Sequence, residues 1–382
     1  MRILLFDWYS GGHHEGYLEA FANALVARHE VVVAAPPASA AAAARAGVEF
    51  QPIEKVSPTV DTAQRLSRNR VRTLGLELDL LATATERARA DHVVHMFADS
   101  ALRRLARRRL DRPTTLVLFR PRAHWRALGG LPPTLGERSV GTAYELALAR
   151  WRRRAEAHAI LTLDELAARR WSRMRGAPAY WLPEPPVARV ELPPTARGGA
   201  ILFGSIAERK GIQHLAGAFR KGGCGVSLTL VGALDPAFTG RFDVLVEELR
   251  RSGVELDLRL HHHEERAALA LLSAAQVAVL PYVGHVGMSR VLLEAAACGT
   301  PVVAHDSGLL GHLVRTRNLG AAVDCRDPSA LAAAIRGFLG DPGAPERHAA
   351  ALRDFAAGYD SDRFADAVLA PFDTARTNRP SN

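Results

Sequence analysis

The sequence predicts an α/β protein made of two doubly wound, Rossmann-like domains. Short apolar runs that suit buried parallel strands alternate with amphipathic helical segments along most of the chain. The length of 382 residues suits two domains better than one. A stretch rich in proline and glycine at 183–199 separates two such series, and the alternation restarts beyond it. We therefore expect each series to form its own sheet, covered by helices.

The first series begins with a strand at 2–7, a glycine-rich turn, a helix at 15–28 and a strand at 31–35. This order of elements is typical of the start of a doubly wound sheet. The remaining strands of this series are expected at 92–97, 114–119, 157–163 and 180–182.

The second series repeats the pattern beyond the proline-rich stretch. Its expected strands lie at 200–203, 227–231, 256–260, 277–280 and 301–304. Its expected helices lie at 212–219, 242–252, 266–275 and 289–298, and a further helix begins at Asp327-Pro328, which suit an N-cap and a first helical position. The elements predict a first domain at 1–190, a second at 191–360, and a last helix with a mobile polar tail at 361–382.

Composition excludes several classes of protein. An apolar content of 48% argues against disorder. The longest apolar stretch, 267–280, is interrupted by polar residues and is shorter than the ~20 residues that a bilayer requires. The first residues lack the pattern of a signal peptide. Three cysteines at wide spacings, Cys224, Cys298 and Cys325, indicate neither disulfides nor a metal site, so we expect a reducing, cytoplasmic location.

The positive charge is concentrated in the first domain. The segment 103–175 holds 18 arginines and 6 acidic residues, whereas the whole chain carries a net charge of +9. The arginine runs at 103–112 and 150–154 are expected on helices. Such a face is either plain solvated surface or favours an anionic partner, such as a membrane or an acidic acceptor. Nucleic acid is not expected, because the aromatic content is 6% and no nucleic-acid motif is present.

A first candidate site lies at 281–303, PYVGHVGMSRVLLEAAACGTPVV. Gly287 and Ser289 precede an expected helix, and the free N–H groups near Ser289–Val291 suit a diphosphate. Glu294 follows about one turn later, where its carboxylate is either a ribose ligand or a partner of the helix dipole.

A second candidate site lies at 201–212, ILFGSIAERKGI. The strand ends at Gly204, and Arg209 and Lys210 follow before the next helix. Cations at the carboxyl end of a strand can bind a phosphate. Of the 49 basic residues only Lys55, Lys210 and Lys221 are lysines, so an arginine-rich coding bias does not account for Lys210.

Together the two sites resemble the C-terminal domain of retaining glycosyltransferases of the GT-B fold, specifically family 4, or group 1. That family has a strand, Gly-Arg, then Lys-Gly, and later Glu-x7-Glu-x-x-A-x-G-x-P-V-V. FGSIAERKG and SRVLLEAAACGTPVV fit this pattern in order and separation, and MRILLFDWYSGGHHEGYLEAFANAL and AEAHAILTLDEL extend the resemblance. It implies an acceptor domain and a donor domain that face each other across a cleft, with the C-terminal helix returning to the first.

The chain departs from the family pattern at three positions. Val286 stands where the first glutamate of Glu-x7-Glu would be, so only Glu294 remains. Ser205 replaces the arginine after the glycine, with Arg209 as an alternative charge, and Arg290 replaces the glycine of a Ser-Gly-Val variant. Two alternatives therefore stay open: a GT-B-fold nucleotide-sugar epimerase, and a catalytically silent nucleotide-sugar or glycan-binding protein.

The resemblance implies a role for particular residues. Lys210, Arg209, His124 and Arg120 are the expected catalytic residues. The expected donor ligands are Gly204, Ser205, Lys210, Gly287, Met288, Ser289, Arg290, Val291 and Glu294. The expected acceptor-side residues are Gly11, Gly12, His13, His14, His95 and Asp99, with His95 alternatively a structural residue.

The implied reaction is transfer of a hexosyl-type sugar from a nucleotide-sugar to an acceptor hydroxyl with retention. The acceptor would be a glycan, a lipid-linked or a natural-product molecule. No cofactor and no metal are expected, since the leaving phosphate itself would assist deprotonation of the acceptor. Arg103–Arg109 would contact an anionic membrane, which makes peripheral attachment at the inner face an option beside a purely cytoplasmic one.

Overall fold

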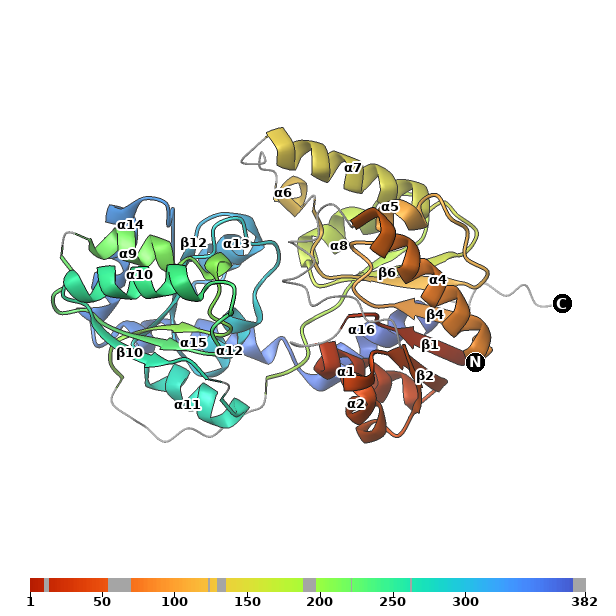
Figure 1. Cartoon of the computed structure of the whole chain (residues 1–382), viewed down its shortest axis with the longest axis horizontal. Coiled ribbons are helices and arrows are strands. Elements are labelled where there is room, and N and C mark those ends of the chain that lie inside the picture. Colours follow the sequence, from red (N-terminus) through yellow and green to blue (C-terminus); the bar gives the residue numbers. More distant parts are fainter. Residues whose placement is uncertain are drawn as a thin grey trace. The chain divides into compact units, whose positions relative to one another are not determined.

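The computed structural model describes residues 1–9, 14–53, 70–122, 124–128, 135–187, 197–220, 222–261 and 263–373. The chain divides into two units: residues 1–185 with 360–382, and residues 186–359. Unit 1 thus ends a few residues before the predicted boundary at 190. Each unit has an all-parallel sheet with helices, which confirms the predicted fold class (Figure 1).

The sheet of unit 1 has the strand order β3-β2-β1-β4-β5-β6-β7, and its order reverses between β1 and β4. Its strands are β1 Arg2–Phe6, β2 Glu30–Ala35, β3 Glu49–Pro52, β4 His92–His95, β5 Thr114–Leu118, β6 Ala157–Thr162 and β7 Ala179–Trp181. Its helices are α1 His14–Val26, α2 Ala40–Arg45, α4 Arg70–Ala88, α5 Leu102–Leu105, α6 His124–Ala127, α7 Leu135–Trp151, α8 Glu165–Ser172 and α16 Ser361–Asp373, with a 3-10 turn at Pro37–Ser39.

Strand β1 shows why this sheet is buried on both faces. Leu4 and Phe6 belong to one core cluster, and the alternating residues Ile3 and Leu5 belong to the other. The C-terminal helix α16 returns to unit 1 as expected: it packs against α1, and its Phe364 meets Phe21 edge to face at 5.5 Å between ring centroids (Figure 1).

The sheet of unit 2 has the order β10-β9-β8-β11-β12-β13, and its order reverses between β8 and β11. Its strands are β8 Ala200–Phe203, β9 Ser227–Val231, β10 Glu255–Arg259, β11 Val277–Leu280, β12 Val302–His305 and β13 Gly320–Val323. Its helices are the 3-10 turn η2 Glu208–Lys210, α9 Ile212–Phe219, α10 Thr239–Arg251, α11 Glu265–Ala274, α12 Arg290–Ala297, α13 Gly308–Thr316, α14 Pro328–Leu339 and α15 Ala344–Ala357.

Helix α14 begins as its sequence predicts. The Asp327 side chain accepts hydrogen bonds from the N–H groups of Ser329 and Ala330, and Pro328 occupies the first turn, where its missing N–H has no helical partner to lose. In unit 1 Asp164 caps α8 in the same way.

The prediction of long arginine-rich helices in unit 1 is wrong. Helix α5 covers only Leu102–Leu105, and the chain continues as turns before Pro113, which cannot extend a helix. The second run is also mostly outside a helix, because α7 ends at Trp151. The arginines at 103–109 therefore do not form one extended helical stripe.

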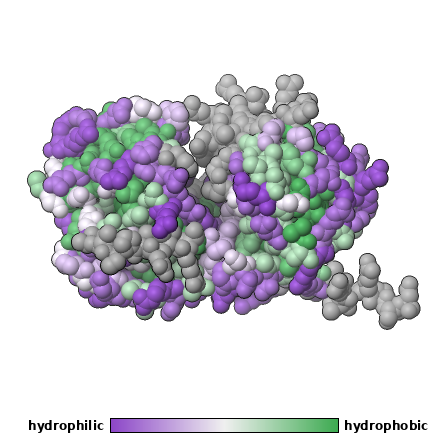
Figure 2. Space-filling view, turned by 90° about the horizontal axis from the view of Figure 1, so that it is seen from below, coloured by the Kyte–Doolittle hydropathy of each residue, from purple (hydrophilic) through white to green (hydrophobic). Residues whose placement is uncertain are grey.

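Hydrophilic side chains cover much of the surface of each unit in the view of Figure 2. Among the described residues, no helix is both long enough and apolar enough to cross a membrane.

Candidate functional site

The candidate site of unit 2 lies where β8 and β11 end side by side, at the point of strand-order reversal. In doubly wound sheets ligands bind at the carboxyl ends of the strands at this switch point. Strand β8 runs into Gly204, which has a φ of 98°, and β11 runs into Pro281 and Tyr282. Lys210, at the end of η2, reaches this same place.

The Lys210 side chain is buried against three groups from two strand ends. Its ammonium donates a hydrogen bond to the Tyr282 hydroxyl at 2.8 Å and a longer one to the Phe203 carbonyl at 3.4 Å. The ammonium also lies 4.3 Å from the centroid of the Tyr282 ring, within the range of a cation–π contact. The residue is 6% exposed, which is unusual for a lysine.

Two glycines make this arrangement possible. At Gly211 the φ is 76°, and a Cβ there would lie 2.1 Å from the carbonyl oxygen of Pro281, so only glycine allows η2 to lie against the end of β11. A Cβ on Gly204 would lie 3.1 Å from the Lys210 ammonium. The Lys-Gly motif therefore reflects close packing as well as charge.

The surroundings of Lys210 lower the pKa of its ammonium to about 7. Burial is the main cause, because it disfavours the charged form, and the positive charge of Arg209 acts in the same direction. The Glu294 carboxylate opposes both effects. An anion with two or more charges would restore the protonated form, since a nearby opposite charge favours it.

Helix α12 begins beside Lys210 and lacks a side-chain cap. Ser289 precedes it with a φ of 72°, a backbone conformation that non-glycine residues rarely adopt, and its hydroxyl does not cap the helix. Gly287, two residues earlier, has a φ of 106°. Val291 in the first turn packs close to Gly204, with its Cγ2 3.5 Å from where a Cβ would be. The structure therefore brings the two sequence motifs together.

The other predicted donor ligands occupy different environments. Glu294 lies 3.4 Å from the Arg290 guanidinium, one turn away on the same helix. Met288 is buried and accepts a hydrogen bond from the Tyr359 hydroxyl at 3.0 Å from its sulfur. Ser205 and Arg209 are exposed, so Arg209 acts on Lys210 through its charge and not through contact with the switch point.

The switch point of unit 1, between β1 and β4, holds a carboxylate and an imidazole instead of an ammonium. Asp7 follows β1 and is fully buried, and its carboxylate lies 2.7 Å from Nδ1 of His14 at the start of α1. The backbone N–H of Tyr9 donates to the same carboxylate at 3.0 Å. The His14 ring packs on Phe97, which has a positive φ of 51°.

Of the two roles that the sequence left open for His95, its surroundings favour the structural one. His95 is fully buried, and its Nε2 lies 2.9 Å from a carboxylate oxygen of Glu77, which is equally buried in α4. Burial raises the pKa of the Glu77 carboxyl, although the hydrogen bond to His95 pulls it down. His95 can face inward because α4 supplies it with a hydrogen-bonding partner.

Asp99 binds the segment after β5 through hydrogen bonds. Its carboxylate accepts hydrogen bonds from the backbone N–H groups of Phe119 at 2.7 Å and Arg120 at 3.2 Å, and from the Tyr144 hydroxyl at 3.0 Å. The Arg120 side chain itself is exposed. Asp99 therefore holds the backbone at Arg120, which the resemblance had suggested as a catalytic residue.

The remaining predicted residues are not placed. Gly11, Gly12 and His13 lie outside the described residues, and so does the side chain of His124 in α6. Sequence reasoning missed Tyr282, Asp7, Glu77 and Tyr144. Asp7 had a usable signal, because it directly follows a buried strand at an expected switch point.

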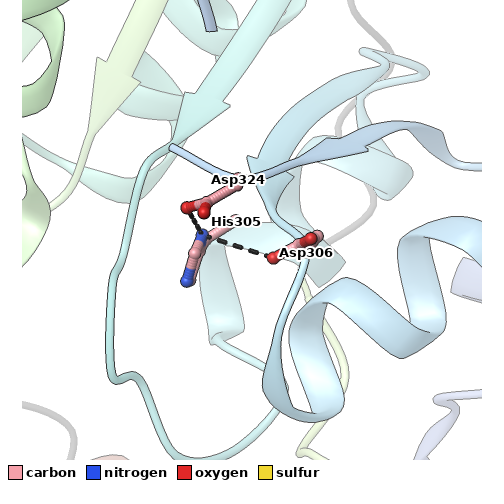
Figure 3. A group of neighbouring side chains, drawn as sticks. All are labelled: His305, Asp306 and Asp324. Carbon is pink, nitrogen blue, oxygen red and sulfur yellow. Dashed lines mark ion pairs between the residues drawn. The ribbon is translucent and has the colours of Figure 1, made fainter. Parts of the chain in front are cut away.

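One group of side chains in the described part of the chain has the composition of a metal site. His305, Asp306 and Asp324 lie at the ends of β12 and β13 (Figure 3). However, the His305 Nδ1 that faces both carboxylates accepts a hydrogen bond from the Cys325 N–H at 3.2 Å. Asp324 is held by both its oxygens on the Arg326 guanidinium, which lowers the pKa of its carboxyl to about 2. These partners make the group a poor metal ligand set.

Most of the second unit is similar to a known protein family. Residues 198–341 match the family described as group 1 glycosyl transferases. The glycogen synthase of Mycobacterium tuberculosis is 34% identical over 165 residues, which are 42% of this chain and 38% of that protein. The matched part thus spans about two fifths of that relative's length.

Solved structures share the fold over the whole chain. Anabaena Alr3699/HepE in complex with UDP superposes with a TM-score of 0.69 at 16% identity, covering 98% of this chain and 100% of that one. A glycosyltransferase from Rickettsia africae gives a TM-score of 0.66 at 11% identity, covering 99% of both chains. Residues 198–341 therefore resemble the group 1 glycosyl transferases, and the chain as a whole has the GT-B fold, with two Rossmann-like units.

Proposed function

We propose that the protein transfers a hexosyl sugar from a nucleotide-sugar to an acceptor hydroxyl, with retention of the anomeric configuration. The observation that carries this proposal is the buried ammonium of Lys210 at the β8–β11 switch point, inside the segment that matches the glycosyltransferase family. Burying a lysine without a carboxylate bonded to it is costly, and a diphosphate ligand supplies the missing negative charge.

Lys210 and the start of α12 bind the donor diphosphate in this proposal. Transfer of the sugar leaves negative charge on the departing nucleoside diphosphate, and a preorganised cation stabilises that charge as it develops. The partial positive charge at the N-terminus of α12, next to Ser289, acts on the same phosphates. Exposed Arg209 adds long-range attraction.

Glu294 binds the ribose of the donor in this proposal. Its carboxylate is partly buried and forms an ion pair with Arg290, one turn away on α12, and a carboxylate can accept hydrogen bonds from ribose hydroxyls. Because Arg290 is paired with Glu294, the charge of Arg290 does not require a second glutamate at the position of Val286.

Unit 1 binds the acceptor in this proposal, through the region around Asp7, His14 and Asp99. Buried carboxylates and an imidazole can orient hydroxyl groups by hydrogen bonds. We propose that the leaving phosphate accepts the acceptor's proton, so that no resident cofactor and no metal take part. Full activity in the presence of EDTA is the expected result.

The nucleotide is tested first as UDP, because the matching Anabaena structure is a complex with UDP. The purified protein is incubated with UDP-, GDP-, dTDP- and ADP-sugars, with and without simple glycoside, glycolipid and aglycone acceptors. Acceptor-dependent release of a nucleoside diphosphate, together with a product of unchanged anomeric configuration, supports the proposal. An altered sugar on an intact nucleotide instead indicates an epimerase. Saturable binding without turnover indicates a silent binding protein.

We further propose that an anionic or membrane-linked acceptor is approached through the exposed arginines of unit 1, with the protein cytoplasmic and peripheral at the inner membrane face. Arg103, Arg107, Arg108 and Arg109 are exposed, and of these Arg108 is paired with Asp79 at 2.5 Å. Changing Arg103, Arg107 and Arg109 together to glutamine is expected to abolish co-sedimentation with phosphatidylglycerol vesicles at 0.05 M salt and to leave UDP affinity unchanged. Binding of the wild type should fall at 1 M salt, because the Debye length shrinks to about 3 Å. A wild type that does not bind at low salt contradicts the membrane proposal.

A further inference from the structure

We propose that Tyr282 is a positioning residue, whose ring and hydroxyl hold the Lys210 ammonium at the β8–β11 switch point and keep it ready to bind the donor diphosphate. The identity of the ligand rests on the proposed function. The positioning itself rests on contacts within unit 2 and can be tested without any turnover.

Tyr282 makes two contacts with the Lys210 ammonium. The hydroxyl oxygen accepts a hydrogen bond from the ammonium at 2.8 Å, and the ring lies 4.3 Å below it, measured to the centroid. Both residues are buried, with Tyr282 3% and Lys210 6% exposed. The backbone at Tyr282 is held by a hydrogen bond from its N–H to the Leu280 carbonyl at 2.8 Å, in a tight turn after β11.

The contacts leave one part of the ammonium for a ligand. An ammonium group has three N–H donors, and the described contacts use two, to Tyr282 and to the Phe203 carbonyl. The remaining donor is directed by the other two, because the three N–H bonds have a fixed tetrahedral arrangement. Tyr282 therefore determines where the third N–H points, in addition to stabilising the charge.

The charged and titratable groups around Lys210 come from three elements. Arg209 lies next to it in η2, Glu294 acts from α12 and is itself paired with Arg290, and His285 packs against the Tyr282 ring at 5.6 Å between centroids. Burial raises the pKa of the Tyr282 phenol, so its hydroxyl stays neutral and serves as an acceptor. Since a hydrogen bond to the charged form favours that form, removing the hydroxyl should make Lys210 lose its proton at lower pH.

The chain offers a direct way to follow this proton. It has three lysines, so protein labelled with ¹³C at lysine Cε gives three signals, and Lys210→Arg identifies the one from Lys210. The pH titration of that signal is recorded for the wild type, for Tyr282→Phe and for Tyr180→Phe, a hydroxyl removal in unit 1 that serves as the matched control. UDP affinity of the same proteins is measured at pH 6 and pH 8.

The proposal predicts that Tyr282→Phe lowers the titration midpoint of the Lys210 signal by about one pH unit, which corresponds to the loss of a hydrogen bond to a charged group. UDP affinity should fall about tenfold at pH 8 and less than threefold at pH 6, where Lys210 is still about half protonated or more in both proteins. Tyr180→Phe should change neither quantity. A Tyr282→Phe protein with the wild-type titration and the wild-type affinities overturns the proposal.

Two further measurements separate the positioning role from the proposed function and cover a variant that does not fold. A Lys210 titration that responds to Tyr282→Phe but not to UDP rejects the proposed function and retains the positioning role. Where Tyr282→Phe fails to fold, as judged by thermal unfolding, 3-fluorotyrosine is incorporated instead, because it has nearly the same shape and a weaker acceptor oxygen. An unchanged Lys210 midpoint in that protein overturns the proposal as well.

Discussion

The two units have the same strand order around their switch points, but the charged groups buried there have opposite signs. In unit 2 the reversal between β8 and β11 buries a cation, Lys210, held by a neutral phenol and a backbone carbonyl. In unit 1 the reversal between β1 and β4 buries a carboxylate, Asp7, bonded to His14. Each arrangement stands at the carboxyl ends of the central strands.

The difference separates two roles: the sheet determines where a ligand binds, and the side chains determine which ligand binds. A doubly wound sheet fixes where a ligand can bind, because only at the switch point do the loops diverge to opposite faces. The side chains delivered there decide what binds: an incompletely compensated cation suits phosphates, whereas carboxylates and imidazole suit hydroxyl groups. The following predictions test whether the two switch points differ in this way.

The largest effect is expected from Gly211→Ala in unit 2. A methyl group there would meet the Pro281 carbonyl at 2.1 Å in a backbone with φ of 76°, so η2 must move away from β11 and carry Lys210 with it. We expect a loss of about 3 kcal/mol or more in the free energy of unfolding, measured with urea. Gly217→Ala in α9 is the control: no atom lies within 4 Å of its Cβ position, and helix propensity should make it neutral or slightly stabilising. Equal effects of the two changes would contradict the packing role of the Lys-Gly motif.

Lys210→Met is expected to stabilise unit 2. The folded state lowers the pKa of this ammonium to about 7, from the ordinary 10.5, so the unfolded chain binds more protons between these values and wild-type stability falls as the pH is lowered through this range. The penalty is complete below pH 7. The methionine variant should therefore gain about 1–4 kcal/mol in urea unfolding at pH 6, and less at pH 9.5. A variant less stable than the wild type at pH 6 would mean that Lys210 serves the fold and not a ligand.

These two changes also show what the sequence could and could not predict. Lys210 was predictable because lysine is rare in this chain and because Lys-Gly follows a strand. Its partner Tyr282 was not, because the contact joins residues 72 positions apart, and only the pairing of β8 with β11 brings them together. The two roles of His95 could not be separated for the same reason: its partner Glu77 lies on α4, a helix that was not predicted from the sequence.

The fold itself was more predictable than its details. The runs Ile3–Phe6 of β1 and Val277–Leu280 of β11 are apolar, and their assignment as buried strands is confirmed. Strand β13 was missed because Gly320–Val323 contains two alanines and a glycine, which favour strands weakly. The arginine run after α5 looked helical because its composition suits a helix, but Pro113 leaves it too little length.

In unit 1 we expect Asp7→Asn to lower stability and to leave the binding of the nucleotide unchanged. The variant weakens the contact with His14 and leaves buried polar atoms imperfectly paired, at a cost of about 1–2 kcal/mol in the free energy of unfolding. UDP affinity should stay within twofold of the wild type, because the nucleotide is assigned to unit 2. Isothermal titration at pH 7 checks this, and a marked loss of UDP affinity would break the division of chemistry between the two switch points.

Binding of the donor diphosphate by the Lys210 ammonium is the central feature of the proposed site. The direct measurement is calorimetric titration of UDP, or of the nucleoside diphosphate selected in the donor screen, into the wild type and Lys210→Met at pH 6.5. Both proteins are first shown to be folded by thermal unfolding. We predict that the variant binds about 10- to 100-fold more weakly, the loss expected for one charged hydrogen bond, although it is the more stable protein. Equal affinity of the two folded proteins would contradict the account.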